Sequence, residues 1–154
     1  MDLRQLFTIL DGRIGRKSYW TGLVILVVIT LIAMVAIYPI TMNVGGPRLA
    51  MLLLLIVQLV LLYPSLAIMS KRFHDRNRPG SLAWIMIVPW LLSALLGALG
   101  ITDPADPFWL DYLLQAVLLI VSIWFLIELG ILKGTDGDNA YGPDPLAGGA
   151  GSTS

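Results

Sequence analysis

Four long apolar segments constrain this chain more than any other feature of its sequence. They lie at about residues 19–38, 49–69, 81–99 and 112–132, and the first contains no charged residue between Thr21 and Ile37. A helix rises about 1.5 Å per residue, so about 20 residues cross the ~30 Å hydrocarbon core of a bilayer. Each segment therefore predicts one transmembrane helix, and residues 39–47 are expected to form a short loop after the first.

The amino-acid composition supports a membrane protein. The chain has 154 residues, of which 57% are hydrophobic and 13% are charged. A soluble domain carries about 25% charged residues, and one of this length cannot bury so much apolar surface in a single core. The excess apolar surface is therefore expected to face lipid. The chain has no cysteine, which excludes disulfides, thiol nucleophiles and cysteine-ligated metals.

The segment before the first apolar run has the pattern of a short amphipathic helix. Leu3, Leu6, Phe7 and Leu10 are spaced at i, i+3, i+4 and i+7 and so share one helical face. Asp2 is suited to cap the start of this helix, and Gly12 to end it. We expect the helix either to lie in the membrane interface or to pack on its own protein.

The basic residues are distributed unevenly between the two sides of the predicted spans. Nine lie before the first span, between the second and third, or after the fourth: Arg4, Arg13, Arg16, Lys17, Lys71, Arg72, Arg76, Arg78 and Lys133. Arg48 is alone on the other side. Basic residues in short loops stay in the cytoplasm, so we expect both termini to be cytoplasmic.

These observations predict an all-α membrane protein, with four transmembrane helices in an antiparallel bundle and a short N-terminal amphipathic helix. Short connections favour antiparallel packing of consecutive helices. Residues 1–145 are expected to form a single membrane domain. Residues 146–154 cannot build a core and are expected to be disordered.

Two polar residues inside the predicted spans need partners. Gln58, in the middle of the second span, is expected to face another helix. Glu128 lies about one turn inside the cytoplasmic end of the fourth span, and an acid at that depth needs a counter-charge. Lys71 or Arg72, at the cytoplasmic end of the second span, is the natural candidate, and we predict an intramembrane ion pair between Glu128 and Arg72.

Three sequence motifs stand out: Gly12–Trp20, then Pro64–Ala67 followed by Arg72–Asp75, and finally Gly137–Pro145. Together they resemble the domain of unknown function 805 family. The similarity extends from about Leu3 to Pro145 and implies a small bacterial inner-membrane protein with several spans. It implies no established activity. The sequence departs from the family pattern at Ala140, where a basic residue is usual, and over Asn77–Leu82, where Ser-Gly-Trp-type residues are usual.

All three motifs fall on the predicted cytoplasmic face, so we expect them to form one small cap. Asn139 suits an Asx-type turn, and Asp138 and Asp144 are placed to pair with nearby arginines. The residues expected to bind a headgroup or a partner are Arg13, Arg16, Arg72, His74, Asp75 and Arg76. Basic residues at this surface favour anionic lipid headgroups. The same surface would suit a partner protein, and the charges would also be explained if they only orient the bundle.

No motif indicates an enzyme or a cofactor. Adjacent residues such as His74 and Asp75 rarely share the geometry of a base and its orienting group. One histidine without cysteine does not supply a zinc site, and the acidic residues match no calcium loop. The basic residues are few and lie at a membrane surface, which argues against nucleic-acid binding. We therefore expect a non-enzymatic scaffold or adaptor. A small transporter or channel component is the alternative, although no ionisable residue lies at mid-membrane.

Overall fold

A computed structural model describes residues 2–103 and 106–147. Within these ranges the helices are α1 (Leu3–Thr8), α2 (Arg16–Val44), α3 (Gly46–Asp75), α4 (Trp84–Ala98) and α5 (Trp109–Phe125), with a 3-10 turn η1 (Gly80–Ala83) before α4 and a π-helical turn η2 (Leu126–Ile131) after α5. Four helical segments of this described part are long and apolar enough to cross a membrane: α2, α3, η1 with α4, and α5 with η2. The predicted all-helical membrane class is therefore confirmed.

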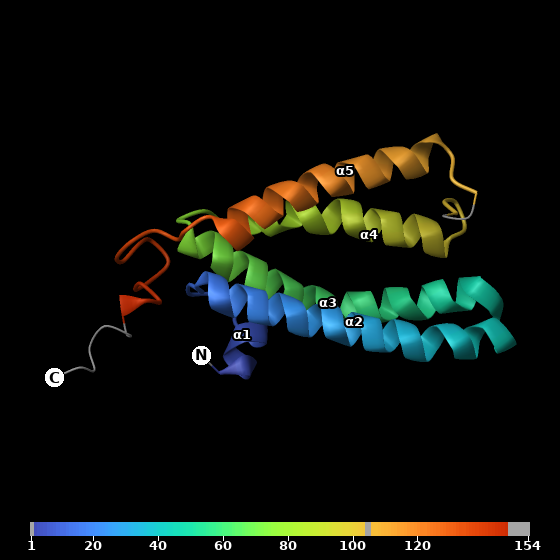
Figure 1. Cartoon of the computed structure of the whole chain (residues 1–154), viewed down its shortest axis with the longest axis horizontal. Coiled ribbons are helices and arrows are strands. Elements are labelled where there is room, and N and C mark those ends of the chain that lie inside the picture. The colour runs from blue at the N-terminus through green and yellow to red at the C-terminus, as the bar shows by residue number, and fades with distance from the viewer. Residues whose placement is uncertain (1, 104–105, 148–154) are drawn as a thin grey trace.

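The four long helices form two pairs. Figure 1 shows α2 alongside α3, and α4 alongside α5, with the two pairs meeting at the end that carries both chain termini and separating toward the other end. The short helix α1 lies against the first pair, near the meeting point. We call this end the polar cap and define it as residues 11–18, 70–80 and 126–147. It contains most of the first sequence motif, Arg72–Asp75 of the second and all of the third, while Pro64–Ala67 lies earlier in α3.

The connection between α2 and α3 differs from the loop expected over residues 39–47. Helix α2 continues through Pro39 to Val44, the chain turns at Gly45, and α3 begins at Gly46. Backbone groups inside a bilayer need partners within their own helix, which favours continued helix over loop. Pro47 stands in the first turn of α3, where its missing N–H leaves no acceptor unsatisfied.

Helix α3 also extends further than its apolar run. It ends at Asp75, so residues 71–75, expected as part of a charged loop, form its last turn and are buried. Lys71 and Arg72 have 0% exposure. Charged side chains are rarely buried unless they are paired, so this turn must find its partners within the protein.

The hydrophobic core lies next to the polar cap, while the outer surfaces of the long helices are apolar. Phe73 packs against Phe125 at 5.5 Å between ring centroids, and Ile14 and Ile68 are buried nearby. Along the rest of the bundle, large apolar side chains remain exposed, as for Val35 at 74%. Exposed apolar surface of this extent is expected of helices that face lipid.

Candidate functional site

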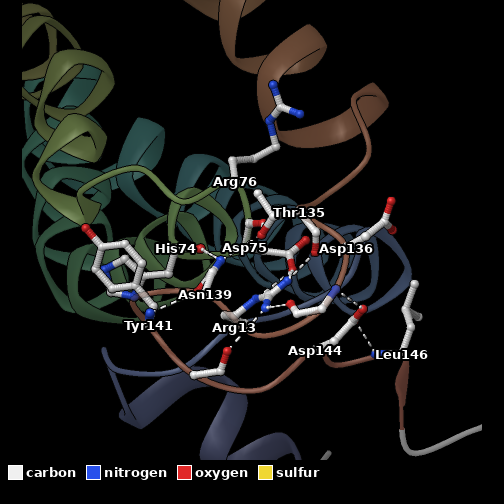
Figure 2. A network of polar contacts seen from close by, with 12 residues as sticks. Arg13, His74, Asp75, Arg76, Thr135, Asp136, Asn139, Tyr141, Asp144 and Leu146 are labelled. Atoms are coloured by element: carbon white, nitrogen blue, oxygen red, sulfur yellow. Dashed lines mark hydrogen bonds and ion pairs between the residues drawn. The ribbon is translucent and has the colours of Figure 1, made fainter.

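Asp75 is the centre of the polar cap. Its Oδ1 accepts hydrogen bonds from Nε and Nη2 of Arg13 at 3.2 and 3.1 Å, and its Oδ2 accepts from Nη1 of Arg72. The Asp75 backbone carbonyl also accepts from the amide of Thr135 at 2.8 Å. With 3% exposure, this carboxylate is buried between two guanidinium groups. The arrangement joins the segment before α2, the end of α3 and the C-terminal tail (Figure 2).

Arg13 uses all of the donors that an arginine has. Besides its bonds to Asp75, it donates to the carbonyls of Thr135 at 2.6 Å, Gly137 at 2.6 Å and Gly142 at 3.2 Å. A guanidinium has five N–H donors in a fixed plane, and the five bonds formed here account for each of them. Arg13 therefore fixes the loop of the tail against α3, and it has no donor left for a ligand.

Side chains from α2 and α3 also cap the end of η2. Five consecutive carbonyls accept from them: Leu129 and Leu132 from Arg72, Gly130 from Trp20, Ile131 from Arg16, and Lys133 from Arg76. The last carbonyls of a helix have no partner within the helix, and cations near that end are favoured by the helix dipole. These side chains thus satisfy a helix end that would otherwise be costly to bury.

The ion pair expected between Glu128 and Arg72 is not the one that the structure forms. Glu128 Oε1 instead lies 3.0 Å from Nε of Arg76 and 3.2 Å from Nε of Arg78, while Arg72 pairs with Asp75. The reason is that α3 continues to Asp75, which supplies Arg72 with a carboxylate one turn away. Glu128 is then left to the arginines that follow the end of α3.

Lys71 holds the short helix α1 in place. Its buried ammonium donates to the carbonyls of Gln5 at 2.7 Å and Leu6 at 2.6 Å, near the C-terminal end of α1. Tyr63 adds a hydrogen bond from its hydroxyl to the carbonyl of Thr8 at 2.8 Å. Helix α1 is therefore attached to α3 through its own unpaired carbonyls.

His74 is enclosed by the first and last motifs. Its Nδ1 lies 3.1 Å from the carbonyl of Gly12, and its ring stacks on Tyr141 with 4.0 Å between centroids. Asn139 donates to the carbonyl of His74 at 2.9 Å, and its own Oδ1 accepts from the amide of Tyr141 at 2.9 Å. The predicted Asx-type turn at Asn139 is therefore confirmed.

The aspartates of the tail stabilise the tail itself and do not pair with the arginines as expected. Asp144 accepts from the amides of Leu146 at 2.9 Å and Gly137 at 3.1 Å, and Asp138 accepts from the amide of Asp144 at 3.3 Å. The hydrogen bond from the Leu146 amide is the main cause that holds the pKa of the Asp144 carboxyl below its ordinary value. Residues 148–154, most of the segment expected to be disordered, lie outside the described residues.

A pocket of about 460 Å³ opens in the polar cap next to the start of α2. Its lining comes from two sides: Gly15, Arg16, Lys17, Ser18, Arg72 and Asp75 from the helices, and Lys133, Gly134, Thr135, Asp136, Asp144, Pro145 and Leu146 from the tail. The side chains of Arg16, Lys17 and Lys133 are exposed at it, whereas Arg72 and Asp75 are buried. We call these three exposed cations the basic rim.

The structure therefore divides the six predicted site residues into two groups. Four of them are buried and form hydrogen bonds within the cap: Arg13, Arg72, His74 and Asp75. Arg76 is partly buried beside Glu128. Arg16 alone among the six is exposed at the pocket. Sequence reasoning missed Lys17 and Lys133 as pocket residues, although it had counted both as basic residues on the same face.

Fold and site together define a class. This is a multi-pass membrane protein whose four spanning segments are joined at one end by a cap of buried, mutually bonded charges. The chain belongs to the DUF805 family of proteins of unknown function, whose family model matches residues 7–143.

Two relatives from Escherichia coli (strain K12) are similar to this chain over most of its length. One, named uncharacterized protein YiiR, is 32% identical over 145 residues, which cover 94% of this chain and 90% of the relative. The other, named inner membrane protein YhaI, is 28% identical over 138 residues, which cover 90% of this chain and 86% of the relative. No solved structure matches the chain.

Proposed function

We propose that the chain is a bacterial inner-membrane protein with both termini and the polar cap in the cytoplasm, where it acts as a non-enzymatic scaffold that holds an anionic phospholipid headgroup. The name of the relative YhaI supports the inner membrane. Nine basic residues lie on the side of the polar cap and one lies on the other side. This distribution supports the cytoplasmic orientation, because basic residues near spans are retained in the cytoplasm.

The pocket beside the basic rim carries the proposal. Every donor of Arg13 is used inside the protein, so binding at the cap falls to the cations that remain exposed. Within the described ranges the ammonium of Lys17 has no hydrogen-bond or ion-pair partner. Lys133 has an exposed partner, Asp136, from which a phosphate can displace it at little cost.

The position of the basic rim suits a lipid headgroup better than a soluble ligand. Arg16 and Lys17 open the first spanning helix, about one turn before Trp20, which is exposed at the surface of the bundle. Aromatic residues of this kind mark the level of the headgroups in a bilayer. The amides of the first turn of α2 also have no capping side chain, because Gly15 occupies the N-cap position. The buried charges then have a separate purpose, which is to keep the tail in place as one wall of the pocket.

Native mass spectrometry of the full chain, supplied with phosphatidylglycerol, tests this function. The double variant Lys17→Gln/Lys133→Gln is compared with Arg4→Gln, which removes an exposed charge from α1. At ~1 kcal/mol per basic residue, the double variant should retain this lipid roughly 25-fold less than the wild type, and Arg4→Gln should retain it normally.

Two other outcomes would replace the proposal. A co-purifying protein that the double variant loses, with lipid retention unchanged, would make the chain a protein adaptor. If the wild type, the double variant and Arg4→Gln are all folded and retain equal amounts of lipid, the charges of the basic rim serve only to orient the bundle.

One observation favours a transporter component as the second candidate. A recess of about 240 Å³ beside α3, α4 and α5 has five polar residues in a partly apolar lining: Gln58, Ser93, Thr102, Asp111 and Gln115. A cysteine placed at position 58 tests whether water reaches it, since the chain has no other cysteine. Reaction with a charged, membrane-impermeant maleimide would support a solvated pathway, and protection of that cysteine would exclude one.

A further inference from the structure

A second pocket lies at the end of the bundle opposite the polar cap. It has a volume of about 670 Å³, within the range of about 300–1,000 Å³ that is usual for ligand sites. Met34 and Tyr38 of α2 form one wall, Met51 and Leu54 of α3 form another, and Gly97 of α4 contributes its open backbone. The body of this pocket is apolar and lies between the two helix pairs.

Charges stand at the mouth of this pocket. Arg48, in the first turn of α3, is the one basic residue at this end of the described helix bundle. Its guanidinium lies over Gly100, where an added Cβ would be 3.5 Å from Nη2. In the described part of the chain the side chain of Arg48 is exposed and forms no hydrogen bond or ion pair. An arginine in this position presents its donors to whatever lies in the pocket.

The carboxylates near Arg48 favour a ligand that carries a positive group next to its phosphate. Asp103 lines the same pocket, and Asp106 is exposed on the loop that follows. A fully anionic headgroup would meet both carboxylates, whereas a zwitterionic one places its phosphate at Arg48 and its ammonium at Asp103. A carboxylate accepts several hydrogen bonds, so other bonds of Asp103 do not prevent this contact.

We propose that this pocket binds one zwitterionic phospholipid, of the phosphatidylethanolamine type. Arg48 binds the phosphate, Asp103 receives the ammonium, and an acyl chain occupies the apolar space between Tyr38, Met51 and Leu54. The site differs from the basic rim in position, charge and lipid class. The bound lipid fills the space where the two helix pairs separate, and it therefore connects the pairs at the end opposite the polar cap.

Competition between two lipids on the full chain tests this site. The protein in mild detergent receives equal amounts of phosphatidylethanolamine and phosphatidylglycerol, and native mass spectrometry counts each lipid retained. We expect one phosphatidylethanolamine on the wild type and about fivefold less on Arg48→Gln, from ~1 kcal/mol per basic residue at a phosphate. Arg4→Gln is the matched control and should retain it fully, as should Lys17→Gln/Lys133→Gln.

A second variant keeps the test decisive if Arg48→Gln does not fold. Gly97→Leu fills the pocket without removing Arg48, and a Cβ at position 97 meets its nearest neighbour, Oγ1 of Thr102, at 3.7 Å. This variant should also lose the lipid. Undiminished retention of phosphatidylethanolamine by a folded Gly97→Leu or Arg48→Gln protein would overturn the proposal. So would a phosphatidylglycerol molecule that Arg48→Gln loses and Lys17→Gln/Lys133→Gln retains, or a dimer mass that Gly97→Leu abolishes, which would assign the pocket to a second copy.

Discussion

Replacing Asp75 with asparagine should destabilise this protein more than any other change of one charge in the polar cap. The substitution keeps the shape of the side chain but removes the charge that lies between Arg13 and Arg72. Side-chain exposure is 1% for Arg13, 0% for Arg72 and 4% for Asp75, so water cannot replace the lost carboxylate.

The size of the effect follows from this burial. Removing one partner of a buried ion pair costs about 3–5 kcal/mol, because the remaining charge stays buried without compensation. An asparagine oxygen can still accept the hydrogen bonds of one of the two arginines, which places Asp75→Asn toward the lower end of that range. At ~2–4 °C per kcal/mol for a chain of this size, the unfolding midpoint should fall by about 6–12 °C.

Thermal unfolding in detergent, followed by circular dichroism, measures this change. Asp136→Asn is the matched control, since Asp136 pairs with Lys133 in the same cap at 2.6 Å but its side chain is 79% exposed. An exposed pair contributes about 0–1 kcal/mol, so the control midpoint should stay close to that of the wild type. The same small shift for both variants would show that the Asp75 network does not hold the cap together.

Three further predictions concern other contacts of the cap. Gly134→Ala should destabilise the protein because its Cβ would overlap the Asp75 carboxylate, whereas Gly97→Ala, whose Cβ would make only an ordinary contact with Thr102 at 3.7 Å, should not; thermal unfolding compares the two. Lys71→Met should release α1, so hydrogen exchange over residues 3–8 should rise at least about tenfold, while Lys17→Met leaves it unchanged. The pKa of Asp144 lies below its ordinary value, so its stabilisation of the tail should be complete above that ordinary value and should disappear as the pH falls through the lowered one. Amide shifts of Leu146 in an NMR titration measure this loss, and Asp144→Asn should abolish the response.

The membrane class was predictable because it depends on long runs of apolar residues, which are visible in the sequence without knowledge of tertiary contacts. The helix ends were less predictable. Pro39 and Pro47 suggest a loop between them, yet a bilayer favours continued helix and leaves Gly45 as the turn. The charged residues after position 70 suggest a loop as well. They remain helical because carbonyls from distant segments and the carboxylate of Asp75, in the last turn of α3 itself, satisfy them.

The sequence predicted that the charged motifs share one cap, but it did not predict which residues of the cap contact one another. It assigned Arg13, Arg72 and Asp75 to one cap, which the structure bears out in space. It did not give the pairing, because the last turn of α3 decides which arginine reaches Asp75 and which reach Glu128. The row of carbonyls at the end of η2 has no sequence signal, since every residue carries a carbonyl. Gly134 was equally hidden, because its importance depends on how closely the tail approaches Asp75.

The orientation of the polar cap is the claim on which the proposed function depends most, and one labelling measurement tests it. The chain has no native cysteine, so single cysteines at Asp136, in the cap, and at Val44, at the opposite end and 80% exposed, give unambiguous signals. Intact cells exposed to a membrane-impermeant maleimide should label Val44→Cys, and Asp136→Cys should react after the membrane is opened. Labelling of Asp136→Cys in intact cells, with Val44→Cys protected, would place the cap outside and contradict the account.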